Sequence, residues 1–237
     1  IIATVGSQVT LLDEIFPEHA RVALLPNGVN LEAFWNVVKK KRSKSDNCFR
    51  LRYAGQFPAW RDTDLMLASL RYLPEQAVLD IAGGKIGLED KTRQDLDAAA
   101  QRLGVADRVN YVGRLHPRDV PAFLANADVL LLPLGGEVQA RYFTCPMKLF
   151  EYAASGVPMV VVRQPTILSL VQDGIHALLV EPGSPEDMAR AITRLQQDCA
   201  LGAILAGNAR AWVGQYTYAK RAARYQDFIT QLILDTN

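Results

Sequence analysis

Short apolar runs alternate with longer amphipathic stretches from Phe49 onward, and this alternation constrains the fold of the 237-residue chain more than any other feature. The runs lack the polar alternation of half-exposed strands and are bounded by turn residues, as is typical of strands buried on both faces of a parallel sheet. Right-handed helical crossovers between such strands give a doubly wound, Rossmann-like α/β domain. The predicted strands are 51–55, 78–83, 109–112, 129–132, 159–162 and 178–180, and the predicted helices lie near 62–73, 89–104, 117–126, 146–155, 166–173, 185–197, 200–213 and 217–234.

The composition excludes several classes of protein. An apolar share of 49% and a charged share of 22% are ordinary for a globular domain, and a net charge of +1 provides no field for nucleic acid or an anionic membrane. The three cysteines, Cys48, Cys145 and Cys199, are scattered, and the three histidines show no metal-ligand spacing. We therefore predict no disulfide framework, no metal site, no nucleic-acid partner and a cytoplasmic location.

The segment from Pro146 to Pro158 predicts a helix with an anion site at its start. Proline is well tolerated at the first turn of a helix, and Gly156 provides the stop. Lys148 and Glu151 are three residues apart and share a face of this helix. A helix N-terminus with a lysine favours phosphate, and a carboxylate accepts hydrogen bonds from hydroxyl groups, so the pattern suits a nucleotide-sugar. A solvated Lys148–Glu151 salt bridge is the alternative interpretation.

This segment resembles the P-x-K-x-x-E-Y-x-A-x-G-x-P motif of the family 4 retaining glycosyltransferases, which have the two-domain glycosyltransferase B fold. Other motifs of that family are matched in order at residues 26–34, 53–55, 61–62, 109–115, 127–133 and 217–222. The resemblance implies that the chain is the C-terminal half of such an enzyme. That half binds a UDP- or GDP-linked nucleotide-sugar for transfer to a glycan, lipid or other acceptor, and it uses no metal or other cofactor.

The resemblance also implies a division of the chain into four parts. Residues 1–35 would be the end of an N-terminal acceptor domain, residues 36–48 a basic linker, residues 49–214 the donor-binding domain, and residues 215–237 a helix that packs back on residues 1–35. A strand at 1–5 and a helix capped by Ser7 open the sequence as if in mid-domain, so we expect the rest of the acceptor domain upstream and the fragment alone to be inactive. Peripheral membrane association of the full-length protein and weak dimerisation are left open.

The loops that follow the predicted strands carry the candidate site residues, because ligands of open α/β sheets bind at the carboxyl ends of strands. The resemblance assigns the leaving diphosphate to Arg61 and Lys148 as catalytic residues, and the ribose to Glu151. Alternatively, Arg61 and Arg114 are ordinary surface residues. Thr144 is a candidate cap of the helix that starts near Pro146. The complete set of donor-binding candidates is Gly55, Gln56, Arg61, Gly83, Gly113, Arg114, Leu115, Glu137, Phe143, Thr144, Met147, Lys148 and Glu151.

Two of these positions depart from the family pattern. Phe143 stands where the family's E-x7-E motif has its first glutamate, and Gln56 stands where the family has an arginine. Glu137 is the nearby carboxylate that could replace the missing one. These losses leave two alternatives: a noncatalytic nucleotide-sugar-binding module, and a nucleotide-sugar epimerase or phosphorylase-like enzyme of the same fold. Phe143 counts against an epimerase, which needs acid and base groups near the anomeric carbon.

Overall fold

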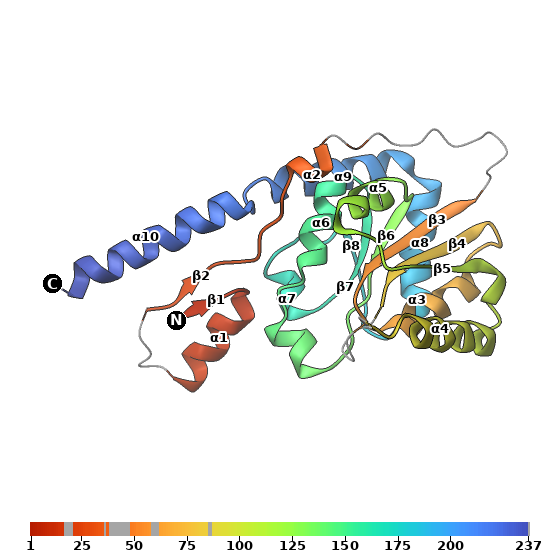
Figure 1. The fold of residues 1–237 in the computed structure, drawn as a ribbon, viewed down its shortest axis with the longest axis horizontal. Coiled ribbons are helices and arrows are strands. Elements are labelled where there is room, and N and C mark those ends of the chain that lie inside the picture. Colours follow the sequence, from red (N-terminus) through yellow and green to blue (C-terminus); the bar gives the residue numbers. More distant parts are fainter. Residues whose placement is uncertain (17–20, 36, 38–47, 58–61, 85–86, 237) are drawn as a thin grey trace.

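A six-stranded parallel sheet lies between two layers of helices in the computed structural model, which describes residues 1–16, 21–35, 37, 48–57, 62–84 and 87–236 (Figure 1). The strand order is β5-β4-β3-β6-β7-β8. The strands are β3 (Phe49–Gly55), β4 (Ala77–Gly83), β5 (Val109–Gly113), β6 (Val129–Leu132), β7 (Met159–Val162) and β8 (Leu178–Val180). The prediction of a doubly wound parallel α/β sheet is confirmed.

Helices cover both faces of the sheet, and this explains why its strands read as continuous apolar runs. Every residue of β6, β7 and β8 is buried. One face is covered by α3 (Thr63–Ser69), α4 (Glu89–Leu103) and α8 (Pro185–Gln197), and the other by α5 (Val120–Ala125), α6 (Met147–Ser155) and α9 (Cys199–Val213). The remaining short helices of this domain are η1 (Leu70–Tyr72), η2 (Ala106–Arg108), η3 (Pro117–Asp119), η4 (Gln139–Phe143) and α7 (Pro165–Leu168).

One predicted helix is much shorter than expected. The stretch near 166–173 forms a helix only as α7, which ends at Leu168. The N–H groups of Leu170 and Val171 both bond the carbonyl of Ile167, so the chain continues in turns rather than in a helical ladder. Gly174, at φ +69°, then reverses the chain towards β8. The apolar residues in this stretch, such as Ile167, Leu170 and Val171, are buried, but their spacing does not arise from a long helix.

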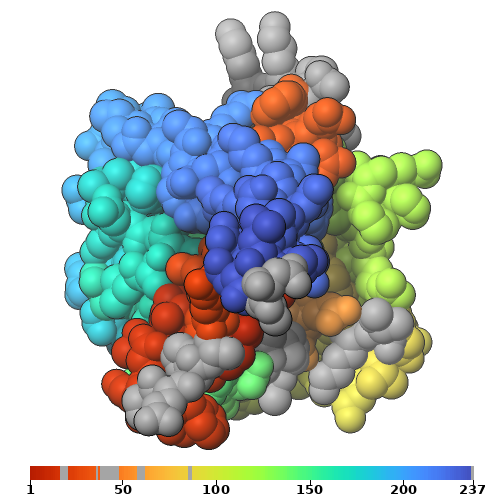
Figure 2. Space-filling view, turned by 90° about the vertical axis from the view of Figure 1, so that its left-hand side faces the viewer, coloured from red at the N-terminus to blue at the C-terminus, as the bar shows by residue number. Residues whose placement is uncertain are grey.

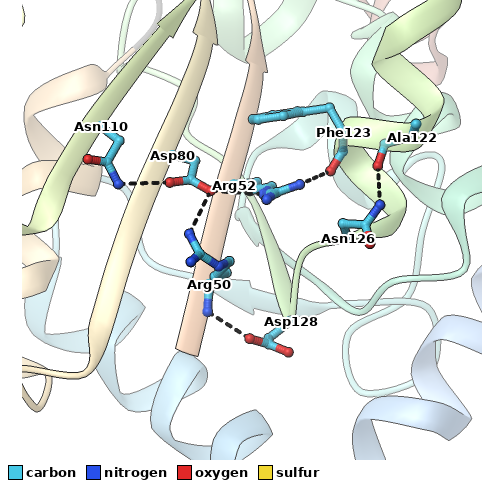
Figure 3. A network of polar contacts seen from close by, with 8 residues as sticks. All are labelled: Arg50, Arg52, Asp80, Asn110, Ala122, Phe123, Asn126 and Asp128. Carbon is cyan, nitrogen blue, oxygen red and sulfur yellow. Dashed lines mark hydrogen bonds and ion pairs between the residues drawn. The ribbon is translucent and has the colours of Figure 1, made fainter. Parts of the chain in front are cut away.

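A row of polar side chains crosses three strands inside the domain (Figure 3). Asn110 of β5, Asp80 of β4 and Arg52 of β3 are neighbours in strand register. The Asp80 carboxylate, only 5% exposed, accepts from Arg52 Nε at 3.0 Å and from Asn110 Nδ2 at 3.0 Å. Arg50 Nη1 lies 3.5 Å from the same carboxylate. Both oxygens of this buried acid therefore have donors, as a buried charge requires.

The same row joins the sheet to its helical cover. Arg52 donates to the carbonyl of Phe123 in α5, and its guanidinium lies 4.5 Å from the centre of the Phe123 ring. At the start of β6, Asp128 Oδ2 accepts the N–H of Arg50 at 2.7 Å. Asp128 thus has a structural contact, and the network fixes α5 and the start of β6 against β3.

The two ends of the chain lie together, outside the large sheet (Figures 1 and 2). Arg21 and Asp235 form an ion pair, and Arg221 Nε donates to the Pro26 carbonyl at 3.0 Å. The elements at these ends are β1 (Ile2–Ala3), α1 (Gly6–Ile15), β2 (Ala23–Leu24), α2 (Glu32–Trp35) and α10 (Tyr218–Thr236), with β1 and β2 forming a parallel pair. The predicted linker at 36–48 falls mostly on residues outside the described ranges.

The details of these ends differ from expectation. Helix α1 begins at Gly6, so Ser7 is inside the helix and cannot cap it; its hydroxyl donates to the Tyr142 carbonyl at 3.0 Å instead. Ile2 of β1 is 43% exposed while Ala3 is 1% exposed, so the opening strand is buried on one side only. In α10 the apolar side chains Tyr225, Ile229, Ile233 and Leu234 are exposed. Spacings of three and four residues place Tyr218, Ala222, Tyr225, Ile229 and Leu232 on one face of this helix, and Tyr218, Tyr225 and Ile229 of that face are exposed.

Removing the Asp80 charge should destabilise the domain, because it breaks the ion pair with the Arg52 guanidinium, which is 14% exposed. We expect Asp80→Asn to lower the free energy of unfolding by about 3 kcal/mol, as when one partner of a buried pair is removed. The control is Asp64→Asn, whose partner Arg102 and own side chain are both more than 60% exposed; its loss should stay below about 1 kcal/mol. Urea unfolding measures both, and equal losses would contradict the structural role of the network.

Candidate functional site

A cavity of about 620 Å³ opens at the carboxyl edge of the sheet, where the strand order reverses between β3 and β6. This reversal is the usual ligand site of an open α/β sheet, since the loops on its two sides lead away from each other. Nine of the candidate residues named from the sequence line this cavity. They are Gly55, Gln56, Gly83, Arg114, Leu115, Thr144, Met147, Lys148 and Glu151.

The floor of the cavity is backbone, and glycine makes it possible. At Gly83, with φ +116°, a Cβ atom would lie 1.9 Å from the carbonyl oxygen of Gly55. The N–H of Gly84 donates to that same oxygen at 3.0 Å, so the ends of β3 and β4 are locked together. Two tyrosine hydroxyls hold the ends of these strands in place. Tyr111 donates to the Gly83 carbonyl at 2.6 Å, and Tyr53 donates to the Gln56 carbonyl at 2.7 Å.

Helix α6 presents its N-terminus to the cavity. Pro146 is the residue before its first turn, and Gly156, at φ +67°, ends it in the left-handed conformation that glycine favours. The predicted cap at Thr144 is wrong, because Pro146 is at the cap position and no described side chain caps the helix; the Thr144 hydroxyl donates to the Gln139 carbonyl at 2.8 Å. The first N–H groups of a helix have no partner within it, and together with the helix dipole they attract an anion.

Lys148 and Glu151 lie one turn apart on the cavity side of α6. Their side chains form an ion pair, Nζ to Oε2 at 2.8 Å, and are 24% and 23% exposed. The salt bridge of the alternative interpretation is therefore present, and both residues also line the cavity. The Lys148 stem crosses Gly55, where a Cβ atom would come 3.2 Å from its Cε. The absent side chain at Gly55 thus leaves room for the lysine to reach the cavity.

Residues that follow β5 add a cation and apolar groups to the lining. Arg114 lines the cavity and pairs with Glu89 at 3.4 Å, with half of its side chain exposed. Leu115, Pro117 and Val120 continue this wall. An apolar surface next to backbone groups and one cation suits a flat heterocycle, which can stack while its edge is hydrogen-bonded.

Four candidate residues are not among those that line the cavity. Arg61 lies outside the described residues. Gly113 ends β5 just before Arg114, and Glu137 lies in the exposed loop before η4. The Phe143 side chain is 38% exposed, and its carbonyl is held by Gln8 Nε2 at 3.2 Å. Neither the Glu137 nor the Phe143 side chain is part of the cavity lining.

Glu137 is nevertheless close to the α3 loop. Burial raises the pKa of Asp62, and the nearby carboxylates of Asp64 and Glu137 raise it further, against the opposing hydrogen bond from the Leu65 N–H. Asp62 caps α3 through that hydrogen bond, at 3.0 Å. The Asp62 carboxylate therefore has a structural role as the cap of α3.

Sequence reasoning missed several lining residues: Asn27, Ala54, Ala82, Gly84, Pro117, Val120, Cys145 and Pro146. Asn27 is in a motif that we assigned to a domain boundary, and its Nδ2 donates to the Cys145 carbonyl at 2.7 Å. Burial raises the pKa of the Cys145 thiol to about 11. Because the thiolate is the nucleophile, this cysteine is a packing residue at neutral pH.

The described part of the chain offers neither a cluster of metal ligands nor a membrane-spanning helix. No group of three or more His, Cys, Asp or Glu side chains there is placed to hold a metal ion. None of its helices has the length and apolar character that a bilayer crossing requires.

Comparison with known proteins identifies the family. The family model described as "Glycosyl transferases group 1" matches residues 48–198, more than half of the chain. The D-inositol 3-phosphate glycosyltransferase of Xylanimonas cellulosilytica is 25% identical over 221 residues, which are 89% of this chain and 51% of that protein. The mannosylfructose-phosphate synthase of Agrobacterium fabrum is 25% identical over 200 residues, 79% of this chain and 43% of that protein. The chain thus spans about half the length of these relatives.

Solved structures share the fold. The sucrose-phosphate synthase of Thermosynechococcus elongatus superposes with a TM-score of 0.83 at 21% identity, covering 99% of this chain and 58% of that one. HepE (Alr3699) of Anabaena, solved with UDP-glucose, gives a TM-score of 0.76 at 20% identity, covering 98% of this chain and 63% of that one. Both are glycosyltransferases of the B type, so the likeness establishes the fold of the chain.

A side chain at Gly83 should disrupt the cavity floor. Gly83→Ala forces a Cβ atom against the Gly55 carbonyl, so we expect a loss of about 3 kcal/mol or more in the free energy of unfolding. Gly104→Ala is the matched control: Gly104 also has a positive φ, +70°, but a Cβ atom there meets nothing within 4 Å. Its loss should be about 1–2 kcal/mol. Chemical denaturation compares the two, and equal losses would rule out a close approach of β3 and β4.

Proposed function

Because the chain belongs to the group 1 family of glycosyl transferases, we propose that its cavity binds the nucleotide-sugar donor of a retaining glycosyl transfer. The observation that carries the proposal is the N-terminus of α6 opening into the cavity with Lys148 and Glu151 beside it. A helix end and a lysine suit a diphosphate, and a carboxylate suits the vicinal hydroxyls of a ribose. The wall formed by Arg114 and Leu115 is the proposed seat of the base.

The proposed chemistry is stabilisation of the leaving group. The bond between the anomeric carbon and the phosphate oxygen breaks, and its electron pair goes to the nucleoside diphosphate. The acceptor hydroxyl oxygen forms the new bond to the same face of that carbon, and its proton passes to the departing phosphate oxygen. Lys148 and the α6 N-terminus would oppose the charge that develops on the diphosphate, which is electrostatic catalysis. Arg61 is proposed to add a second cation, and metal independence is part of the proposal.

The first donor to test is UDP-linked, since HepE of Anabaena was solved with UDP-glucose. GDP-linked donors are the next class. The relatives' names refer to sugar phosphates and inositol phosphate, while a glycan or lipid-linked acceptor remains part of our own proposal. We also propose a cytoplasmic location, peripheral membrane association of the full-length protein and weak dimerisation.

A noncatalytic nucleotide-sugar-binding module is the second candidate. Gln56 favours it, because this neutral residue lines the cavity where an arginine would supply another cation. An epimerase receives less support: among the described residues that line the cavity, Glu151 is the one carboxylate, and it is paired with Lys148. Binding without transfer by the full-length protein would favour the module.

A donor screen tests the proposal. UDP-glucose, GDP-mannose and ADP-glucose are added to the chain, and saturation near 100 Kd should add about 2.7 kcal/mol of stability. Lys148→Ala should weaken nucleoside diphosphate binding by about 1.5–3 kcal/mol, because a charged hydrogen bond is lost and Glu151 is left unpaired. Arg118→Ala, which removes an exposed cation outside the cavity lining, is the charge control. Calorimetry that finds no binding by the wild type would refute the proposal.

Glu151 should distinguish a ribose from a sugar without its hydroxyls. A vicinal diol supplies two donors, and an amide offers one acceptor oxygen where a carboxylate offers two. Glu151→Gln should therefore weaken UDP more than 2′,3′-dideoxy-UDP. Any change in the pairing with Lys148 affects both ligands and cancels in the comparison. Equal calorimetric losses would assign Glu151 to the helix and not to the ligand.

A further inference from the structure

We propose that Asn27 determines donor specificity by accepting a hydrogen bond from a hydroxyl group of the transferred sugar. The inference rests on the proposed donor-binding function and adds a residue from outside the sheet domain. Asn27 lies between β2 and α2, yet it lines the cavity together with the loop that leads into α6.

Asn27 is bound directly to the entrance of α6. Its Nδ2 donates to the Cys145 carbonyl at 2.7 Å, and its backbone N–H lies 3.4 Å from the Cys145 sulfur. Cys145 precedes Pro146, the residue before the first turn of α6. The Asn27 amide is therefore placed next to the backbone that would receive the diphosphate.

The residues on both sides of Asn27 are held by the C-terminal part of the chain. The Pro26 carbonyl accepts from Arg221 Nε at 3.0 Å, and the Val29 N–H donates to the Tyr216 carbonyl at 2.9 Å. Gly28 packs so closely that a Cβ atom would lie 3.0 Å from the N of Tyr218. Asn27 is thus fixed at its backbone and at its side chain, which is the preorganisation that a binding residue needs.

The chemistry of the amide leaves an acceptor for a ligand. Its donor is used by Cys145, so the planar group holds Oδ1 in a defined direction. Among the described residues we find no partner for Oδ1, and a carbonyl oxygen can accept two hydrogen bonds. Sugar hydroxyls are donors of the required kind.

The position of the diphosphate decides which part of the donor comes near Asn27. With the ribose at Glu151, one turn inside α6, and the base at Arg114, the sugar lies at the other end of the diphosphate. The sugar is therefore placed near the residues that precede α6, Thr144 and Cys145. The Phe143 side chain is apolar, Glu137 is absent from the lining, and the Thr144 hydroxyl is held by its bond to the Gln139 carbonyl, so we place the acceptor at this end on Asn27.

Calorimetry with UDP and UDP-glucose tests the inference through the ratio of their affinities. Asn27→Ala should weaken UDP-glucose about fivefold to tenfold, as expected for one net neutral hydrogen bond, and UDP less than twofold. Asn27→Asp keeps an acceptor but loses the donor to Cys145, so its affinity ratio should stay near that of the wild type. Asn30→Ala is the control, because Asn30 is an exposed amide of the same segment that bonds the Glu32 N–H outside the cavity lining.

The outcomes separate this inference from the proposed function. If the wild type binds neither ligand, the donor-binding proposal fails and the inference falls with it. If the wild type binds UDP, and Asn27→Ala weakens both ligands equally or neither, only the assignment of Asn27 is overturned. The assignment of Asn27 is also overturned if both Asn27→Ala and Asn27→Asp lose the wild type's preference for UDP-glucose over UDP. The property shared by the two variants is the missing bond to Cys145, which would then account for the effect. Should Asn27→Ala fail to fold, Asn27→Ser replaces it in the same comparison.

Discussion

The reversal of strand order between β3 and β6 is the constraint on which the rest of the site depends. These strands pair in register at Leu51 and Val129, but the chain leaves them in opposite directions, towards β4 and towards β7. No crossover helix can cover the edge where they part, so a cavity remains there. The glycines at the ends of β3 and β4 and the N-terminus of α6 all meet at this edge, which concentrates backbone donors in one place.

The domain uses two groups of charges in different ways. Asp80 is almost completely buried, and Arg52 and Asn110 bind both of its oxygens, so this network is committed to holding strands and helix α5 together. Lys148 and Glu151 form a pair that keeps about a quarter of each side chain exposed to the cavity. A pair of this kind costs little to rearrange, because water and ligand groups can replace its partners. The difference in burial separates the structural charges from those available for binding.

The cavity is not made by the sheet domain alone. Asn27 reaches it from the N-terminal segment, and that segment is held by Arg221 and Tyr216 near the start of α10. Residues that are distant in the sequence therefore share one wall. The exposed apolar residues Tyr225, Ile229, Ile233 and Leu234 follow Arg221 along the same helix.

The sequence by itself determined the sheet, its strands and the start of α6, because these depend on local patterns: buried apolar runs, a proline at the entry and Gly156 at the exit. It also placed Lys148 and Glu151 on one face through helical spacing. Tertiary structure decided what depends on distant partners. Thr144 is not the cap because α6 begins after Pro146, the helix near 166–173 ends early in turns, and Phe143 is outside the cavity lining. Asn27 and the contact between Gly83 and Gly55 were invisible for the same reason: spacing along a chain does not record which segments approach each other in space.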